Sequence, residues 1–71
     1  MTLRELRLQN KKTVAEVAKV LGVTETAVYN YENAIRRISL EQVIILSKIY
    51  DETAEEIINA QLKSQSSKPI K

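Results

Sequence analysis

The amino-acid sequence predicts an all-α protein of five short helices, and three observations support this fold class. The chain of 71 residues contains one glycine and one proline, it lacks the alternating pattern typical of strands, and helix-start signatures recur along it. Each signature is a Ser or Thr followed three residues later by Glu or Gln. This is a capping box, in which two side chains satisfy backbone N–H groups that the first helical turn leaves free. The boxes begin at Thr2, Thr13, Ser39 and Thr53.

These signatures predict helices over residues 2–9, 13–21, 39–50 and 53–62. A further helix over 24–32 begins at Thr24, with Ala27 in place of the usual acidic partner. We expect residues 1–62 to form one domain. Residues 63–71 are polar and aperiodic, so we expect them to form a flexible tail.

The spacing of apolar residues predicts which side of each helix faces the core. The candidates in the first three helices are Leu3, Leu6, Val17, Ala18, Leu21, Val28 and Tyr31. Gly22 is placed to end the second helix in a left-handed conformation. In the fourth helix the arc expected to face the core consists of Leu40, Val43, Ile44, Ser47 and Tyr50. Ile45 and Ile49 lie opposite that arc.

The chain has neither cysteine nor histidine, which excludes several kinds of chemistry. Disulfides, thiolate metal sites and Cys nucleophiles are ruled out, and the commonest metal ligand and general base is missing. The sequence therefore favours a binding module over an enzyme, with no metal and no cofactor. The longest apolar run, residues 43–46, is far too short to span a membrane, and the N-terminus shows no signal-peptide pattern. We expect a cytoplasmic protein that does not bind membranes.

The formal net charge of +2 conceals an uneven distribution. Residues 1–12 sum to +3 and residues 36–50 to +2, whereas residues 51–62 carry −4. Because an anionic partner is attracted to the basic segments and repelled by the acidic one, we expect the fifth helix to face away from such a partner.

The most informative segment is residues 13–37, in which one capped helix ends at Gly22 and the next begins directly after Thr24. Small Ala18, the glycine in the turn and aliphatic Val28 allow two helices to pack closely at a steep angle. This is the geometry of a helix-turn-helix, whose second helix enters the major groove of DNA.

The segment resembles the helix-turn-helix family of phage repressors and Cro proteins, the xenobiotic-response-element type of bacterial regulator, and the resemblance extends over about residues 2–60. The matching residues are Leu3-Arg4-Glu5-Leu6-Arg7, Thr13, Glu16-Val17-Ala18, Leu21-Gly22-Val23-Thr24, Val28, Tyr31-Glu32-Asn33, Leu40 and Leu46. The resemblance implies a five-helix, repressor-like fold and a bacterial or phage-encoded regulator that binds double-stranded DNA.

The chain departs from the family pattern at four positions. A glutamine that contacts phosphate in the family is replaced by Val14, and the glycine after the third helix is replaced by Ala34. A left-handed backbone at an alanine costs ~1 kcal/mol. Ile38 stands where the family has a proline, and Asp51 where it has a glycine.

Four side chains near the start of the third helix are expected to face outward and contact DNA bases: Glu25, Thr26, Tyr29 and Asn30. The resemblance places all of these except Tyr29 at base-contact positions. Asn30 suits a bidentate contact with adenine, Thr26 a thymine methyl, and Glu25 the amino group of cytosine. Tyr29 is suited to a sugar or phosphate. The alternative for Glu25 is a favourable interaction with the helix dipole that needs no DNA.

Phosphate contacts are expected from residues that flank this helix, namely Lys11, Lys12, Thr24, Asn33, Arg36 and Arg37. The alternative for the basic residues is an ordinary solvated surface. Glu32 is expected to pair with Arg36, four residues later, or with another basic residue.

The sequence thus predicts a sequence-specific, Cro-like or repressor-like transcriptional regulator, with no small-molecule ligand evident. Because one unit reads few bases, we expect a homodimer on a palindromic operator. The candidate dimer surface is Ile45, Ile49, Ile58 and Leu62. The alternative is that other helices of the same monomer cover these residues. The competing function is a protein-interaction module, such as an anti-repressor that binds another regulator.

Overall fold

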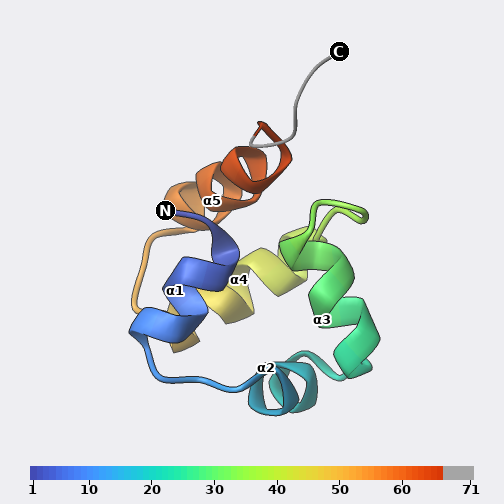
Figure 1. Cartoon of the computed structure of the whole chain (residues 1–71). Coiled ribbons are helices and arrows are strands. Elements are labelled where there is room, and N and C mark those ends of the chain that lie inside the picture. Colours follow the sequence, from blue (N-terminus) through green and yellow to red (C-terminus); the bar gives the residue numbers. More distant parts are fainter. Residues whose placement is uncertain (67–71) are drawn as a thin grey trace.

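Five helices surround a single core in the computed structural model, which describes residues 1–66, with side chains described through residue 63 (Figure 1). They are α1 (Leu3–Gln9), α2 (Val14–Leu21), α3 (Glu25–Glu32), α4 (Leu40–Ile49) and α5 (Ala54–Ser66). No strand occurs among the described residues. The predicted all-α, five-helix fold is therefore confirmed.

The helices begin where their caps predict. Thr2, Thr13 and Ser39 each form a complete capping box with the side chain three residues later. Thr24 accepts a hydrogen bond from the Ala27 amide alone, at 3.1 Å. At the start of α5 the Thr53 hydroxyl accepts a hydrogen bond from the Glu56 amide at 3.1 Å. Each cap residue lies just outside its helix, so all five predicted starts were one residue early.

The predicted end of the last helix was wrong. α5 continues to Ser66, past the expected end at residue 62, because no glycine or proline interrupts the pattern before Pro69. Part of the predicted tail is therefore helical. Residues 67–71 of that tail lie outside the described residues.

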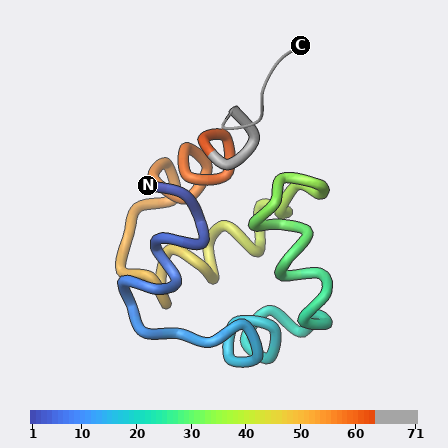
Figure 2. Tube along the Cα trace, viewed as in Figure 1, coloured from blue at the N-terminus to red at the C-terminus, as the bar shows by residue number. Residues whose placement is uncertain are grey.

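The path of the chain brings α3 against α1, α2 and α5, while α4 packs on α2 and α5 (Figure 2). Leu3, Leu6, Val17, Val28 and Tyr31 are buried as predicted, around Ile57 of α5, which is completely inaccessible. Ala18 is buried with them, while Leu21 is only partly buried against this core.

The predicted core face of α4 was wrong in part, since Val43 and Tyr50 are buried as expected but Leu40 and Ile44 are not. Leu40 and Ile44 are 73% and 50% exposed, and the face that enters the core consists of Val43, Leu46 and Tyr50. α4 has apolar residues on both sides, so the hydrophobic pattern alone does not set its rotation. The neighbours α2 and α5 select the i, i+3, i+7 row instead.

Four turn residues adopt left-handed backbone conformations. Gly22 has φ +71° and ends α2 as predicted. Ala34 has φ +61°, which confirms the strained position expected after α3, and Asp51, in the family's other glycine position, has φ +54°. Lys11 shares this conformation at φ +58°. At Ala34 the chain reverses through a hydrogen bond from the Ile35 amide to the Asn30 carbonyl, at 2.8 Å.

Replacing Ala34 by glycine is expected to stabilise the protein. The substitution relieves the left-handed strain of an L-residue but increases the freedom of the unfolded chain, so the net gain is roughly 0.5–1 kcal/mol. Urea unfolding measures it. Ala15→Gly, at an exposed position in α2, is the matched control and is expected to destabilise by up to about 1 kcal/mol. If Ala34→Gly and Ala15→Gly destabilised the protein equally, this would contradict backbone strain at Ala34.

Candidate nucleic-acid interface

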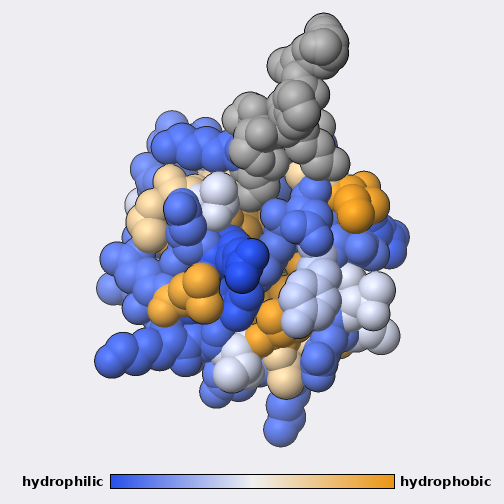
Figure 3. Space-filling model, viewed as in Figure 1, coloured by the Kyte–Doolittle hydropathy of each residue, from blue (hydrophilic) through white to orange (hydrophobic). Residues whose placement is uncertain are grey.

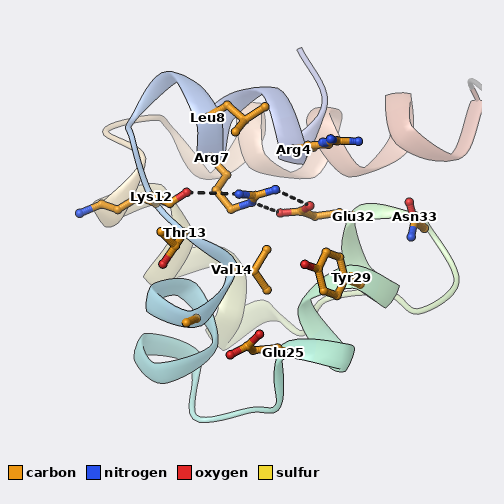
Figure 4. Close-up of a pocket in the computed structure, with 11 residues that line it drawn as sticks. Arg4, Arg7, Leu8, Lys12, Thr13, Val14, Glu25, Tyr29, Glu32 and Asn33 are labelled. Carbon is orange, nitrogen blue, oxygen red and sulfur yellow. Dashed lines mark hydrogen bonds and ion pairs between the residues drawn. The ribbon is translucent and has the colours of Figure 1, made fainter.

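A groove of about 660 Å³ lies between α1, the beginning of α2 and α3 (Figure 4). Its lining is Arg4, Arg7, Leu8, Lys12, Thr13, Val14, Ala15, Glu25, Tyr29, Glu32 and Asn33. Four of these residues, Lys12, Glu25, Tyr29 and Asn33, are among those predicted to contact DNA. The space-filling view shows a largely hydrophilic face with isolated apolar spots (Figure 3).

An ion pair between α1 and α3 lies in this groove. Arg7 Nε donates to Glu32 Oε2 at 2.7 Å, and Nη2 donates to Oε1 at 3.3 Å. The two side chains are only 9% and 5% exposed. Arg7 Nη1 also donates to the Lys12 carbonyl at 3.2 Å, so the same guanidinium holds the segment leading into α2.

Of the two alternatives expected for Glu32, pairing with another basic residue is confirmed, because the partner is Arg7 and not Arg36. Arg36 is exposed in the loop that follows α3, because the helix ends at Glu32 and the i+4 relationship no longer applies. The hydrogen bond to Glu32 raises the pKa of the Arg7 guanidinium above its ordinary value, against the opposing effect of burial. Burial also raises the pKa of the Tyr50 phenol, and the Glu32 carboxylate adds to that effect.

The four predicted base-contacting residues divide into two pairs on neighbouring sides of α3. Glu25 and Tyr29, one turn apart, line the groove, with Tyr29 49% exposed. In Figure 4 both point into it, and Glu25 extends toward α2. Thr26 is exposed, and Asn30 is partly exposed, outside the lining of the groove. A side chain that contacts DNA bases must point outward from the helix, and among these four residues Thr26 meets this requirement most clearly.

The predicted phosphate-contacting residues lie before α2, at the two ends of α3 and in the loop after α3. Arg36 and Arg37 are exposed in the loop after α3, and Lys11 is exposed before α2. Lys12 is partly buried; its ammonium points away from the groove in Figure 4, while its carbonyl faces Arg7.

Thr24 and Asn33 occupy the two caps of α3. The Thr24 hydroxyl already accepts a hydrogen bond as the N-cap, and Asn33, the C-cap, is exposed at the edge of the groove.

Two features of the groove were not anticipated from the sequence. Arg4 adds an exposed cation one turn before Arg7, and the i, i+3 spacing of these arginines is the pattern that indicates it. Val14, in the family's phosphate-contacting position, is 8% exposed and belongs to the hydrophobic core. Its side chain therefore packs inside the protein.

Tyr31 connects α3 to α4. It is buried as predicted, and its hydroxyl accepts a hydrogen bond from Gln42 Nε2 at 3.0 Å. The other atom of that amide, Gln42 Oε1, accepts from the Ser39 amide in the capping box of α4. One glutamine thus fixes both the start of α4 and the buried side of α3.

Two classes of site are not found in the described part of the chain. No helix there is both long and apolar enough to cross a bilayer. Among the same residues, no cluster of His, Cys, Asp or Glu side chains is arranged to hold a metal ion.

Comparison with known proteins identifies similar sequences. The helix-turn-helix family model matches residues 3–57. A putative HTH-type transcriptional regulatory protein of Thermococcus kodakarensis is 40% identical over 57 residues, which are 80% of this chain and 18% of that protein. The HTH-type transcriptional regulator AnsR of Bacillus subtilis is 30% identical over 64 residues, covering 90% of this chain and 55% of AnsR.

A third relative is the uncharacterized HTH-type transcriptional regulator YobD of Bacillus subtilis, 29% identical over 56 residues. These are 79% of this chain and 50% of YobD. The chain thus spans between about a fifth and about half of the length of these relatives. No solved structure matches the chain significantly.

Proposed function

The chain belongs to the Cro/C1-type helix-turn-helix family of DNA-binding regulators, and on that basis we propose that it is a sequence-specific transcriptional regulator that inserts α3 into the major groove. The observation that carries the proposal is the arrangement around α3. Glu25, Thr26 and Tyr29 are exposed along the helix. Basic residues are exposed on both sides of it, namely Lys11 before α2 and Arg36 and Arg37 in the loop after α3.

Base reading is assigned to the exposed side of α3. Asn30 offers a donor and an acceptor that match the major-groove edge of adenine, and Thr26 offers a methyl for thymine. Glu25 is an acceptor for the cytosine amino group, while Tyr29 at the groove suits the sugar-phosphate backbone. These assignments follow from side-chain chemistry, together with the exposure of Glu25, Thr26 and Tyr29 and the partial exposure of Asn30.

Backbone contact is assigned to Lys11, Lys12, Thr24, Asn33, Arg36 and Arg37, with Arg4 added because it lines the groove. The acidic residues Glu55 and Glu56 are exposed at the start of α5. α5 packs on α1, α3 and α4 and is not in contact with α2. This supports an orientation in which the turn between α2 and α3 approaches DNA and the acidic helix stays away from it.

Two substitutions distinguish base recognition from phosphate contact. A duplex is first selected from a random library with the full chain, and binding is then measured across a salt series. Asn30→Ala is expected to reduce the preference for the selected duplex over a scrambled one, by about 1–3 kcal/mol. Arg36→Ala is expected to weaken both duplexes alike and to lower the slope of log affinity against log salt by about 1.

The matched control is Asn59→Ala, an exposed asparagine on α5 that is expected to leave binding unchanged. Selection that yields no preferred sequence, with binding that does not respond to salt, contradicts the proposal. That result would favour the competing function, a module that binds another regulator.

We further propose that the regulator binds a palindromic operator as a homodimer, with α5 in the interface. Ile58 and Leu62 are each 44% exposed one turn apart on α5. Of the other two predicted residues, Ile49 is partly buried against the core of its own monomer, and Ile45 is partly exposed. The proposed surface is therefore centred on α5.

Ile58→Glu is expected to convert the dimer to a monomer at micromolar concentration, because it places a charge in an apolar contact. Sedimentation velocity measures the change. Val20→Glu, at a 48% exposed position on α2, is the matched control that leaves the dimer intact. A wild-type protein that sediments as a monomer at all concentrations would contradict the interface.

A further inference from the structure

A buried glutamine on α5 binds the backbone of the loop that follows the reading helix. Gln61 is only 7% exposed. Its Nε2 donates to the Arg36 carbonyl at 2.7 Å and lies 3.4 Å from the Tyr31 carbonyl, and its Oε1 accepts from the Ile38 amide at 3.2 Å. One side-chain amide thus joins α5 to the end of α3 and to the loop between α3 and α4.

The two shorter bonds lie on either side of Arg37. The Arg36 carbonyl and the Ile38 amide both bond to the side-chain amide of Gln61. The backbone of a neighbouring β-strand bonds to an extended segment in the same way. The first part of the loop has its own bonds, since the Ile35 and Arg36 amides donate to the Asn30 carbonyl at 2.8 and 3.3 Å. Gln61 therefore bonds the part of the loop that follows the last backbone hydrogen bonds to α3.

Packing alone does not explain a glutamine at this position. Its neighbours Ile57 and Ala60 are 0% and 2% exposed, so the site is as buried as the rest of the core. A buried amide is unfavourable there unless its polar atoms are bonded. The two shorter of the three bonds that compensate it go to the backbone on either side of Arg37, and the third goes to the Tyr31 carbonyl at the end of α3. Gln61 also lies beyond residues 3–57, the segment that the family model matches.

We propose that Gln61 is a positioning residue for DNA binding. It orders the backbone of residues 36–38 in the free protein, so that Arg36 and Arg37 contact phosphates without the loop having to become ordered on binding. The inference rests on the proposed DNA-binding function. Fixing the backbone of one residue costs roughly 1–2 kcal/mol, which corresponds to about a tenfold change in affinity for each residue that must be ordered on binding. Gln61 removes that cost from the binding step.

The test compares the wild-type chain of 71 residues with Gln61→Met, which keeps the approximate length and volume of the side chain and removes its hydrogen bonds. Asn59→Met, at an exposed position on the same helix, is the matched control. The first readout needs no DNA. Amide hydrogen exchange at Ile38 is expected to accelerate about tenfold or more in Gln61→Met, while exchange at Val17 in α2 changes only as much as global stability does.

The second readout is the affinity for a mixed-sequence DNA duplex across a salt series, below the unfolding temperature of every variant. Gln61→Met is expected to bind about tenfold more weakly at low salt, with a salt slope that is lower by up to about 1 for each phosphate that the loop no longer neutralises. Because Arg37 then acts from a disordered loop, adding Arg37→Ala is expected to weaken Gln61→Met less than it weakens the wild type.

The possible failures are distinguishable. A wild type that binds the duplex, together with Gln61→Met of unchanged affinity and salt slope, would overturn the positioning role and leave the proposed function standing. If amide hydrogen exchange at Ile38 were the same in Gln61→Met as in the wild type, this would overturn the positioning role without any DNA-binding measurement. A wild type that binds no duplex even at low salt would overturn the proposed function, and this inference with it.

Discussion

The ion pair between Arg7 and Glu32 is the interaction on which the rest of the molecule depends. It connects α1 to the end of α3 with two hydrogen bonds, and a third bond, to the Lys12 carbonyl, holds the segment that enters α2. The attraction within a buried pair offsets the desolvation of both charges only with good geometry and additional hydrogen bonds, and the two bonds to the carboxylate together with the bond to the Lys12 carbonyl supply both. The helix-turn-helix is therefore fixed to α1 by directional bonds as well as by apolar packing.

Three buried or half-buried polar groups surround α3 and leave its outer side free. Arg7 holds Glu32 from α1, Gln42 holds the Tyr31 hydroxyl from α4, and Gln61 holds the following loop from α5. No buried side-chain polar atom in the described region lacks a partner. Polar groups satisfied in this way specify one arrangement of a small core. These bonds hold α3 on its buried side, while Thr26 stays exposed and Asn30 partly exposed on the other side.

The local features of the fold were predictable from the sequence, and the long-range ones were not. Capping boxes, the stop at Gly22 and the strained Ala34 depend on residues close together in the chain, so their chemistry is visible in the sequence. The Arg7–Glu32 pair joins positions 25 apart, and the i+4 rule suggested Arg36 instead. The rotation of α4 about its axis was predicted incorrectly, because a helix that is apolar on both sides does not reveal in its sequence which side faces the core. Of the candidate site, the exposure of Thr26, Arg36 and Arg37 was anticipated, whereas the groove and the roles of Arg4 and Gln61 require the folded chain.

A double-mutant cycle on the ion pair tests this account most directly. Urea unfolding is measured for Arg7→Met, Glu32→Met and the double variant. Because each single substitution leaves a buried charge without a partner, each is expected to cost about 3–5 kcal/mol, and the double variant is expected to cost less than the sum by about 2 kcal/mol or more. Additive losses below about 1 kcal/mol each, as measured for solvent-exposed pairs, would contradict the central role of this interaction.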